Sequence, residues 1–128
     1  SSIREALEKT GVLAALSKDY KLFHDAPDKA LEDYLSKNPT KIVIQQSKFE
    51  IDVQYRLVQY NVSLEHDANA LSYHEMEGLN AQSTLHEVYE HLKNTRSGAV
   101  YIYDQELNDI IGVITWNILQ SFLQKAQY

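Results

Sequence analysis

The sequence predicts an α/β fold of the α+β type, built from two copies of a small β-α-β-β-α unit. Stretches with apolar residues at helical spacing alternate with short β-branched or aromatic runs. The order of these stretches also repeats, so that Leu31 and Ile42 correspond to Val88 and Ala99, 57 positions later. Since such a unit cannot easily cover its own small sheet, we expect the two copies to pack face to face as one compact module.

Size and composition limit what this module can be. A chain of 128 residues buries one core or two small, closely packed ones. The net charge of -6 argues against nucleic-acid partners and anionic membranes, which select clusters of Lys and Arg. The absence of cysteine excludes disulfides, thiolate catalysis and Cys-ligated zinc. No apolar run approaches the roughly 20 residues that span a bilayer, so we expect no direct membrane insertion of this segment.

The chain opens with a segment that stands outside the repeat. Residues 3–16 carry apolar side chains at helical spacing, which predicts an amphipathic helix with Gly11 as a weak point in its middle. We interpret residues 1–19 as a lead-in helix and linker.

Residues 20–72 form the first copy of the repeated unit. Pro27 suits the first turn of a helix, where its missing N–H costs nothing, and Asn38 followed by Pro39 ends that helix. Residues 45–50 are polar. The predicted elements are a strand at 20–23, a helix that begins at 25–27 and ends at 38, a strand at 42–44, a strand within 51–60 and a helix at 63–71.

Residues 73–128 form the second copy, where several independent signals agree. Ser83 or Thr84 is a good N-cap for a helix with apolar residues at helical spacing, and Thr115 caps the last helix in the same way. The predicted elements are a short strand at 73–76, a helix from 83 or 84, strands at 99–103 and 110–114, and a final helix from 115 to 123.

Three stretches of the second copy resemble a CBS motif, the module first named from cystathionine β-synthase. They are 84–88 (Thr-Leu-His-Glu-Val), 97–104 (Ser-Gly-Ala-Val-Tyr-Ile-Tyr-Asp) and 111–115 (Ile-Gly-Val-Ile-Thr). In that family a helix opens with Thr-Leu, a strand ends in Asp, and Gly-hydrophobic-hydrophobic-Thr precedes the final helix. Two motifs form one Bateman module there. The resemblance implies a degenerate first CBS motif at 20–72 and a second at 73–128.

The first half of the chain resembles a more specific group. Residues 10–16, 18–20, 30–31 and 39–44 are similar to the cytoplasmic C-terminal CBS pair of bacterial ClC-type chloride channels and transporters. This resemblance implies a non-enzymatic regulatory domain at the cytoplasmic face of the inner membrane. Its partners are then the transmembrane portion of the parent transporter and a second copy of the chain, as a homodimer. The domain modulates chloride transport through its conformation or dimerisation. The alternative is a free-standing CBS protein that senses adenine nucleotides.

CBS pairs often bind adenine nucleotides through a Thr or Ser and an Asp three residues later, and a carboxylate there can accept both ribose hydroxyls. Gly112 and Thr115 match this pattern, whereas Ile118 stands at the Asp position. Asn117 could substitute if the helix start is shifted, and Trp116 could stack on a base. Gly112, Thr115, Trp116 and Asn117 are the candidate site for ATP, ADP or AMP, and no other cofactor is expected. Thr115 as a plain N-cap and Trp116 as a filler of the cleft or of an interface stay open.

The histidines invite comparison with a zinc-protease helix. His86 and His91 are five residues apart, which places them about 140° apart on a helix of 3.6 residues per turn, so they cannot share one ion. We interpret them as part of a solvated helix face. No nucleophile elbow, P-loop or dinucleotide glycine pattern occurs. We therefore expect no catalysis, and a small hydrolase is the weakest alternative.

Overall fold

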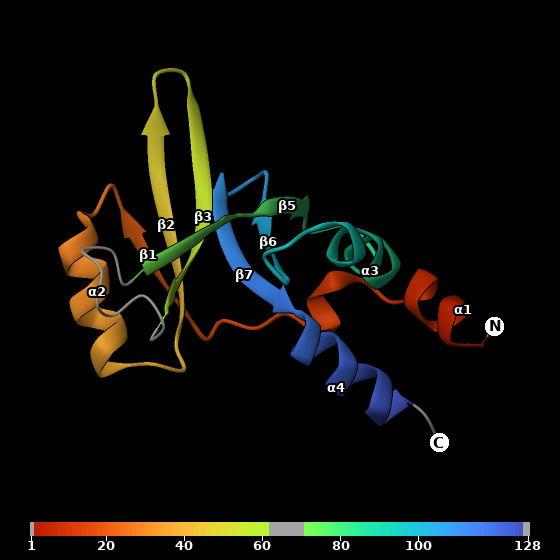
Figure 1. Ribbon diagram of the computed structural model, residues 1–128. Helices are drawn as coiled ribbons and strands as arrows, with labels where there is room; N and C mark the ends of the chain where they lie inside the picture. Colours follow the sequence, from red (N-terminus) through yellow and green to blue (C-terminus); the bar gives the residue numbers. More distant parts are fainter. Residues whose placement is uncertain (1, 62–70, 127–128) are drawn as a thin grey trace. The chain divides into compact units, whose positions relative to one another are not determined.

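The fold consists of two β-sheets and four α-helices among residues 2–61 and 71–126, the part of the chain that the computed structural model describes (Figure 1). The predicted α+β class is confirmed. The chain divides into two units: unit 1 comprises Ser1–Lys18 and Met76–Tyr128, and unit 2 comprises Asp19–Glu75. None of the helices in the described ranges is long and apolar enough to cross a membrane.

Unit 2 is a four-stranded sheet in the order β1-β2-β3-β4, packed against one helix. Its elements are β1 (Tyr20–His24), α2 (Asp28–Lys37), β2 (Ile42–Phe49), β3 (Asp52–Tyr60) and β4 (Leu71–Glu75). β1 pairs parallel with β2, and the other neighbouring strands pair antiparallel. α2 is the connection that parallel pairing requires. The buried core of the unit is Leu31, Leu35, Val43, Val58 and Leu71.

A tyrosine on β4 ties this edge strand to α2. The Tyr73 hydroxyl donates a hydrogen bond to the Asp28 carboxylate, and the Arg56 guanidinium lies over the Tyr73 ring. Burial of the phenol, followed by its hydrogen bond to Asp28, raises the pKa of Tyr73 well above its usual value. The raised pKa keeps Tyr73 in its neutral, donating form.

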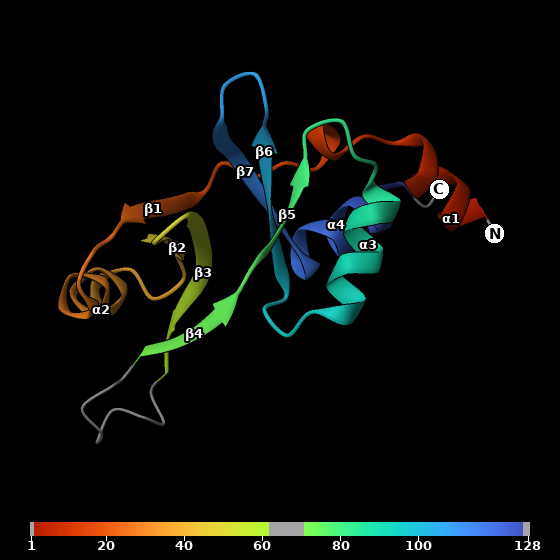
Figure 2. The ribbon, with the colours of Figure 1, turned by 90° about the horizontal axis from the view of Figure 1, so that it is seen from above.

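Unit 1 is a three-stranded sheet in the order β5-β6-β7, with helices from both ends of the chain. Its elements are α1 (Ser2–Lys9), the 3-10 helix η1 (Val12–Ala14), β5 (Glu77–Asn80), α3 (Leu85–Asn94), β6 (Ala99–Asp104), β7 (Asp109–Thr115) and α4 (Trp116–Ala126). β5 and β6 are parallel, and β6 and β7 are antiparallel. Figure 2 shows α3 and α4 beside these strands. The core is Leu7, Val12, Leu85, Val88, Leu92, Val100, Ile102, Ile114 and Leu119.

The predicted repeat is visible in the bounds of the elements. α2 begins at Asp28 and α3 at Leu85, 57 positions later, and both helices have the same length. β2 and β6, and likewise β3 and β7, begin 57 positions apart. The order strand, helix, strand, strand therefore recurs as predicted. The helix predicted at 63–71 lies outside the described residues except for Leu71, which begins β4.

The prediction that residues 73–76 open the second copy is wrong. Most of this stretch belongs to β4, which pairs antiparallel with β3 in unit 2, where Tyr73 packs against the core. β5 opens the second copy instead. β4 pairs with β3, the strand before it in the chain, and a strand of five residues carries no sequence signal that says whether it joins the preceding sheet or the following one.

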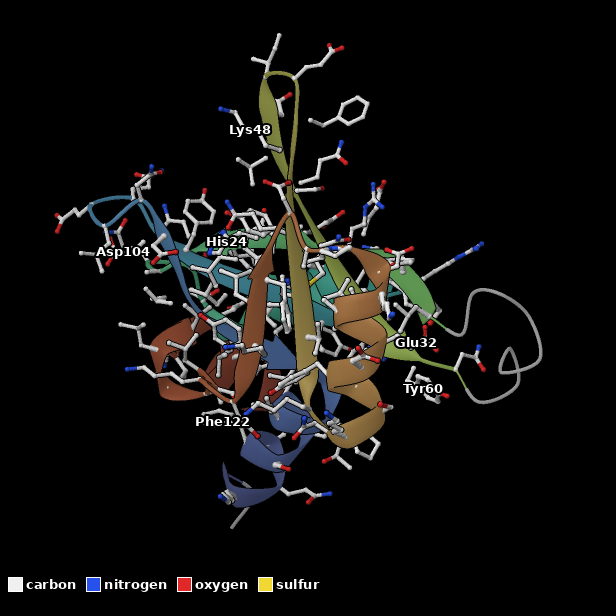
Figure 3. All side chains as sticks on the ribbon, turned by 90° about the vertical axis from the view of Figure 1, so that its left-hand side faces the viewer. His24, Glu32, Lys48, Tyr60, Asp104 and Phe122 are labelled. Atoms are coloured by element: carbon white, nitrogen blue, oxygen red, sulfur yellow. The ribbon has the colours of Figure 1, made fainter. Side chains whose placement is uncertain are left out.

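Two further boundaries differ from the prediction. The strand predicted at 42–44 is longer, because β2 continues through the polar residues to Phe49 and forms a long hairpin with β3. Figure 3 shows Lys48 close to the turn of this hairpin. The lead-in helix, predicted over 3–16, ends at Lys9. Gly11 beyond it is extended, with φ -76° and ψ 159°, and pairs with Thr84.

Candidate functional site

The residues predicted to bind a nucleotide lie where β7 runs into α4. Thr115 is the last residue of β7, and its Oγ1 accepts a hydrogen bond from the Ile118 N–H at 3.2 Å. This is the contact of an N-cap, which satisfies one of the free N–H groups in the first turn of α4. Asn117 is exposed in that turn. The Ile118 side chain packs against the unit 1 core. The hydroxyl of the predicted nucleotide site thus caps the helix.

Trp116 is engaged with the core of unit 1. Its ring meets the Tyr89 ring edge to face, with 5.7 Å between the centroids and 89° between the planes. Its backbone N–H donates to the Gly98 carbonyl oxygen at 3.1 Å. Gly98 has φ +70° in the turn before β6, a backbone conformation that favours glycine. Trp116 therefore fastens the start of α4 to α3 and to that turn, which is the packing role that the sequence left open.

Gly112 is covered by the lead-in segment. A Cβ atom at this position would lie 2.5 Å from Leu16 Cγ and Cδ1 and 2.8 Å from the Ser17 carbonyl oxygen. These distances are shorter than real Cβ contacts, so glycine is needed here for close approach of the backbone. The structure brings Thr115, Trp116 and Asn117 together at the start of α4 and places Gly112 beneath the lead-in.

A groove of about 410 Å³ lies between β5 and α3. Most of its lining comes from these two elements, and Tyr103 of β6 completes it. The lining residues are Gly78, Leu79, Asn80, Ser83, His86, Glu87, Glu90, His91 and Tyr103. We call this the β5–α3 groove. Ser83 directly precedes the N-cap of α3, and His86 and Glu87 lie in its first turn, so the position of the helix N-terminus shapes the groove.

Each histidine in the groove is paired with a carboxylate. His91 Nδ1 meets the Glu77 carboxylate of β5, and His86 Nε2 lies 3.6 Å from Glu90 Oε1, one turn along α3. Glu87 closes a capping box, because its carboxylate accepts from the Thr84 N–H at 3.2 Å while Thr84 Oγ1 accepts from the Glu87 N–H at 3.4 Å. Carboxylates lining the groove repel phosphate and favour cationic or hydrogen-bonding groups.

Sequence reasoning did not find this groove. The signal available was the pair of i, i+4 spacings, His86 with Glu90 and Glu87 with His91, which puts all four side chains on neighbouring faces of one helix. The contribution of Glu77 has no local signal, since β5 reaches α3 only through the fold. Among the described residues, no group of three or more His, Asp or Glu side chains is arranged to hold a metal ion.

Comparison with known proteins identifies the fold. No protein-family model and no curated protein matches the chain. Among solved structures, the CBS domain of the bacterial CNNM/CorC family Mg²⁺ transporter superposes with a TM-score of 0.70 at 10% identity, over 99% of this chain and 82% of that chain. A CBS-domain pair with bound AMP from Klebsiella pneumoniae has a TM-score of 0.64 at 12% identity, over 91% of this chain and 99% of that chain. The chain therefore has the fold of a CBS-domain pair.

A third similar structure belongs to a channel. The cytosolic domain of the Mg²⁺ channel MgtE in complex with ATP has a TM-score of 0.59 at 10% identity, over 94% of this chain and 52% of that chain. The predicted CBS pair is thus confirmed as a fold. These three similar structures do not show the finer resemblance to ClC-type chloride transporters.

We expect Thr115→Ala to lower the free energy of unfolding by about 1 kcal/mol, because it removes the N-cap of α4. Thr115→Ser is the matched control, since serine keeps the hydroxyl and should stay close to wild type. Urea denaturation followed by circular dichroism measures both variants. Equal stability of the alanine and serine variants would contradict the capping role.

Proposed function

We propose that this chain is a non-enzymatic regulatory CBS-pair domain of a membrane ion transporter, located at the cytoplasmic face of the inner membrane. The observation that carries the proposal is the likeness, over 99% of this chain, to the CBS domain of a CNNM/CorC family Mg²⁺ transporter. The likeness to the cytosolic domain of MgtE and to the CBS pair of a putative Mg²⁺ transporter from Shewanella oneidensis supports the same role.

In this proposal the domain regulates transport by a shift between two arrangements. Whatever packs or binds differently in the two arrangements changes their populations and so biases the transmembrane portion. The domain needs no catalytic group for this role. Its direct partners are the transmembrane portion and a second copy of the same chain.

The identity of the transported ion is the finer part of the proposal. Residues 10–16 and 39–44 resemble the CBS pair of ClC-type proteins and favour chloride. The similar structures with a named ion come from Mg²⁺ transporters and favour a divalent cation. We propose chloride on the residue pattern, with Mg²⁺ as the alternative that the structural likeness favours.

The complete coding sequence and a flux assay of its product test this proposal. We expect the open reading frame to encode hydrophobic spans in addition to this chain, and the purified product to carry chloride into liposomes. Uptake of Mg²⁺ in place of chloride would show that the proposed ion is wrong. The proposed regulatory role of the domain would then still stand. A reading frame that holds no membrane span would overturn both.

Dimerisation is expected because several strands carry half-buried tyrosines, including Tyr55 and Tyr103. Tyrosine suits interfaces that have one wet side. Static light scattering should give roughly twice the mass of one chain at high concentration, as expected for a closed two-fold pair, and a smaller mass on dilution. If the measured mass stays that of a single chain at every concentration, the proposed homodimer is excluded and conformational change is left as the mechanism.

The alternative is a free-standing sensor of adenine nucleotides, and the AMP bound to the similar CBS-domain pair from Klebsiella pneumoniae is the observation that supports it. In this chain the Thr115 hydroxyl caps α4, and Ile118 offers no acceptor for a ribose hydroxyl. We therefore expect nucleotide binding at 112–117 to be weak or absent.

Calorimetry and thermal unfolding with ATP, ADP and AMP at millimolar concentration test this expectation. Thermal unfolding reports on binding because a ligand that binds only the folded state raises the melting temperature. We expect neither heat of binding nor a stability increase. Binding that is lost in Asn117→Ala, a change at an exposed side chain, would place the ligand at the start of α4 and overturn the expectation of weak or absent binding.

A further inference from the structure

The segment 10–17, which we call the strap, follows α1 directly and belongs to unit 1 with it, although all of unit 2 separates it in sequence from the strands and from α3 and α4 of that unit. Val12 is fully buried in the unit 1 core, and Leu16 packs against the same core. Leu13 between them is 62% exposed. The strap is thus held at two ends and crosses the surface in the middle.

One end of the strap binds the N-terminus of α3. The Leu85 N–H donates to the Thr10 carbonyl oxygen at 2.8 Å, and the Val12 N–H donates to the Ser83 carbonyl oxygen at 3.0 Å. Leu85 is the first residue of α3, so its N–H has no partner within the helix. The strap supplies that partner. Its position and the position of the first turn of α3 are therefore linked.

The other end of the strap covers an edge of the sheet. Ser17 and Val113 exchange two hydrogen bonds, N–H of Ser17 to O of Val113 at 3.0 Å and N–H of Val113 to O of Ser17 at 2.9 Å. β7 is an edge strand of the three-stranded sheet, and an unpaired edge is a template for pairing with other strands. Gly112, beside this pairing, gives the backbone of the strap room to approach.

We propose that the strap is a conformational switch that opens as one unit, freeing the N-terminal turn of α3 and the edge of β7 together. Val12 is the one strap residue in the buried cluster, and Ala15 and Leu16 pack against it while only partly buried. Segments with few fully buried contacts open at lower free energy than the core around them. Because Ser83, His86 and Glu87 line the β5–α3 groove, opening of the strap changes the shape of that groove. The regulatory meaning of this switch rests on the proposed function, whereas its existence does not.

Hydrogen exchange of the full chain tests the switch, because four amides report on it: those of Val12, Ser17, Leu85 and Val113. In Gly112→Val the added side chain meets Leu16 and the Ser17 carbonyl oxygen. We expect the protection of all four amides to fall together by about tenfold or more, while amides that pair β5 with β6 keep theirs. If Gly112→Val does not fold, Gly112→Ala gives the same test with a smaller change.

Gly11→Ala is the matched control. Like the substitutions of Gly112 in β7, it adds a Cβ atom at a glycine, but this glycine lies within the strap itself. Gly11 has φ -76°, which any residue adopts, and its nearest neighbour to an added Cβ is the Ser83 carbonyl oxygen at 3.9 Å. Its exchange should equal that of wild type. Loss of protection at only one end of the strap, or equal loss throughout unit 1, would overturn opening as one unit.

A double-mutant cycle links the effect to the contact. Leu16→Ala removes the Cγ and Cδ1 atoms that an added Cβ at position 112 would meet. Gly112→Ala should therefore reduce protection less in the Leu16→Ala background than in wild type, and strictly additive effects would contradict the proposed contact. This readout needs neither a nucleotide nor a transporter. Failure of the switch and failure of the proposed function are thus distinguishable.

Discussion

Each unit depends on one β-α-β crossover, in which a helix covers the small sheet formed by the strands on either side of it. β1, α2 and β2 make this crossover in unit 2, and β5, α3 and β6 make it in unit 1. Parallel pairing requires such a connection, and the helix supplies the apolar face that a short sheet cannot bury alone. Leu31 and Leu35 serve one core, and Val88 and Leu92 serve the other at equivalent positions.

Unit 1 has the smaller sheet and completes its core with residues from the start of the chain. Leu7 is 2% exposed and Val12 is 0% exposed, both in that core. This packing explains Gly112 better than a ligand does, because the glycine lets the lead-in approach the backbone of β7. The lead-in is hydrogen-bonded both to the N-terminus of α3 and to the backbone of β7.

Packing and capping at the start of α4 occupy the residues that the nucleotide-binding pattern would use. The start of α4 must be capped and fastened, and Thr115 and Trp116 do this through Ile118 N–H and the Tyr89 ring. Ile118 itself contributes apolar surface to the core of unit 1, where a carboxylate would be costly to bury. His86 and His91, which line the β5–α3 groove, pair with the carboxylates of Glu90 and Glu77.

The sequence by itself determined the elements whose signals are local. Helical spacing, Thr84 and Thr115 as caps, and the repeat of 57 positions predicted α3, β6, β7 and α4, and the same repeat applied to β1 would have placed β5 correctly. Only the tertiary structure decided that 71–75 joins unit 2, that the lead-in completes unit 1, and that Glu77 meets His91. These features depend on hydrogen bonds and contacts between residues far apart in the chain, for which neither spacing nor composition carries a signal.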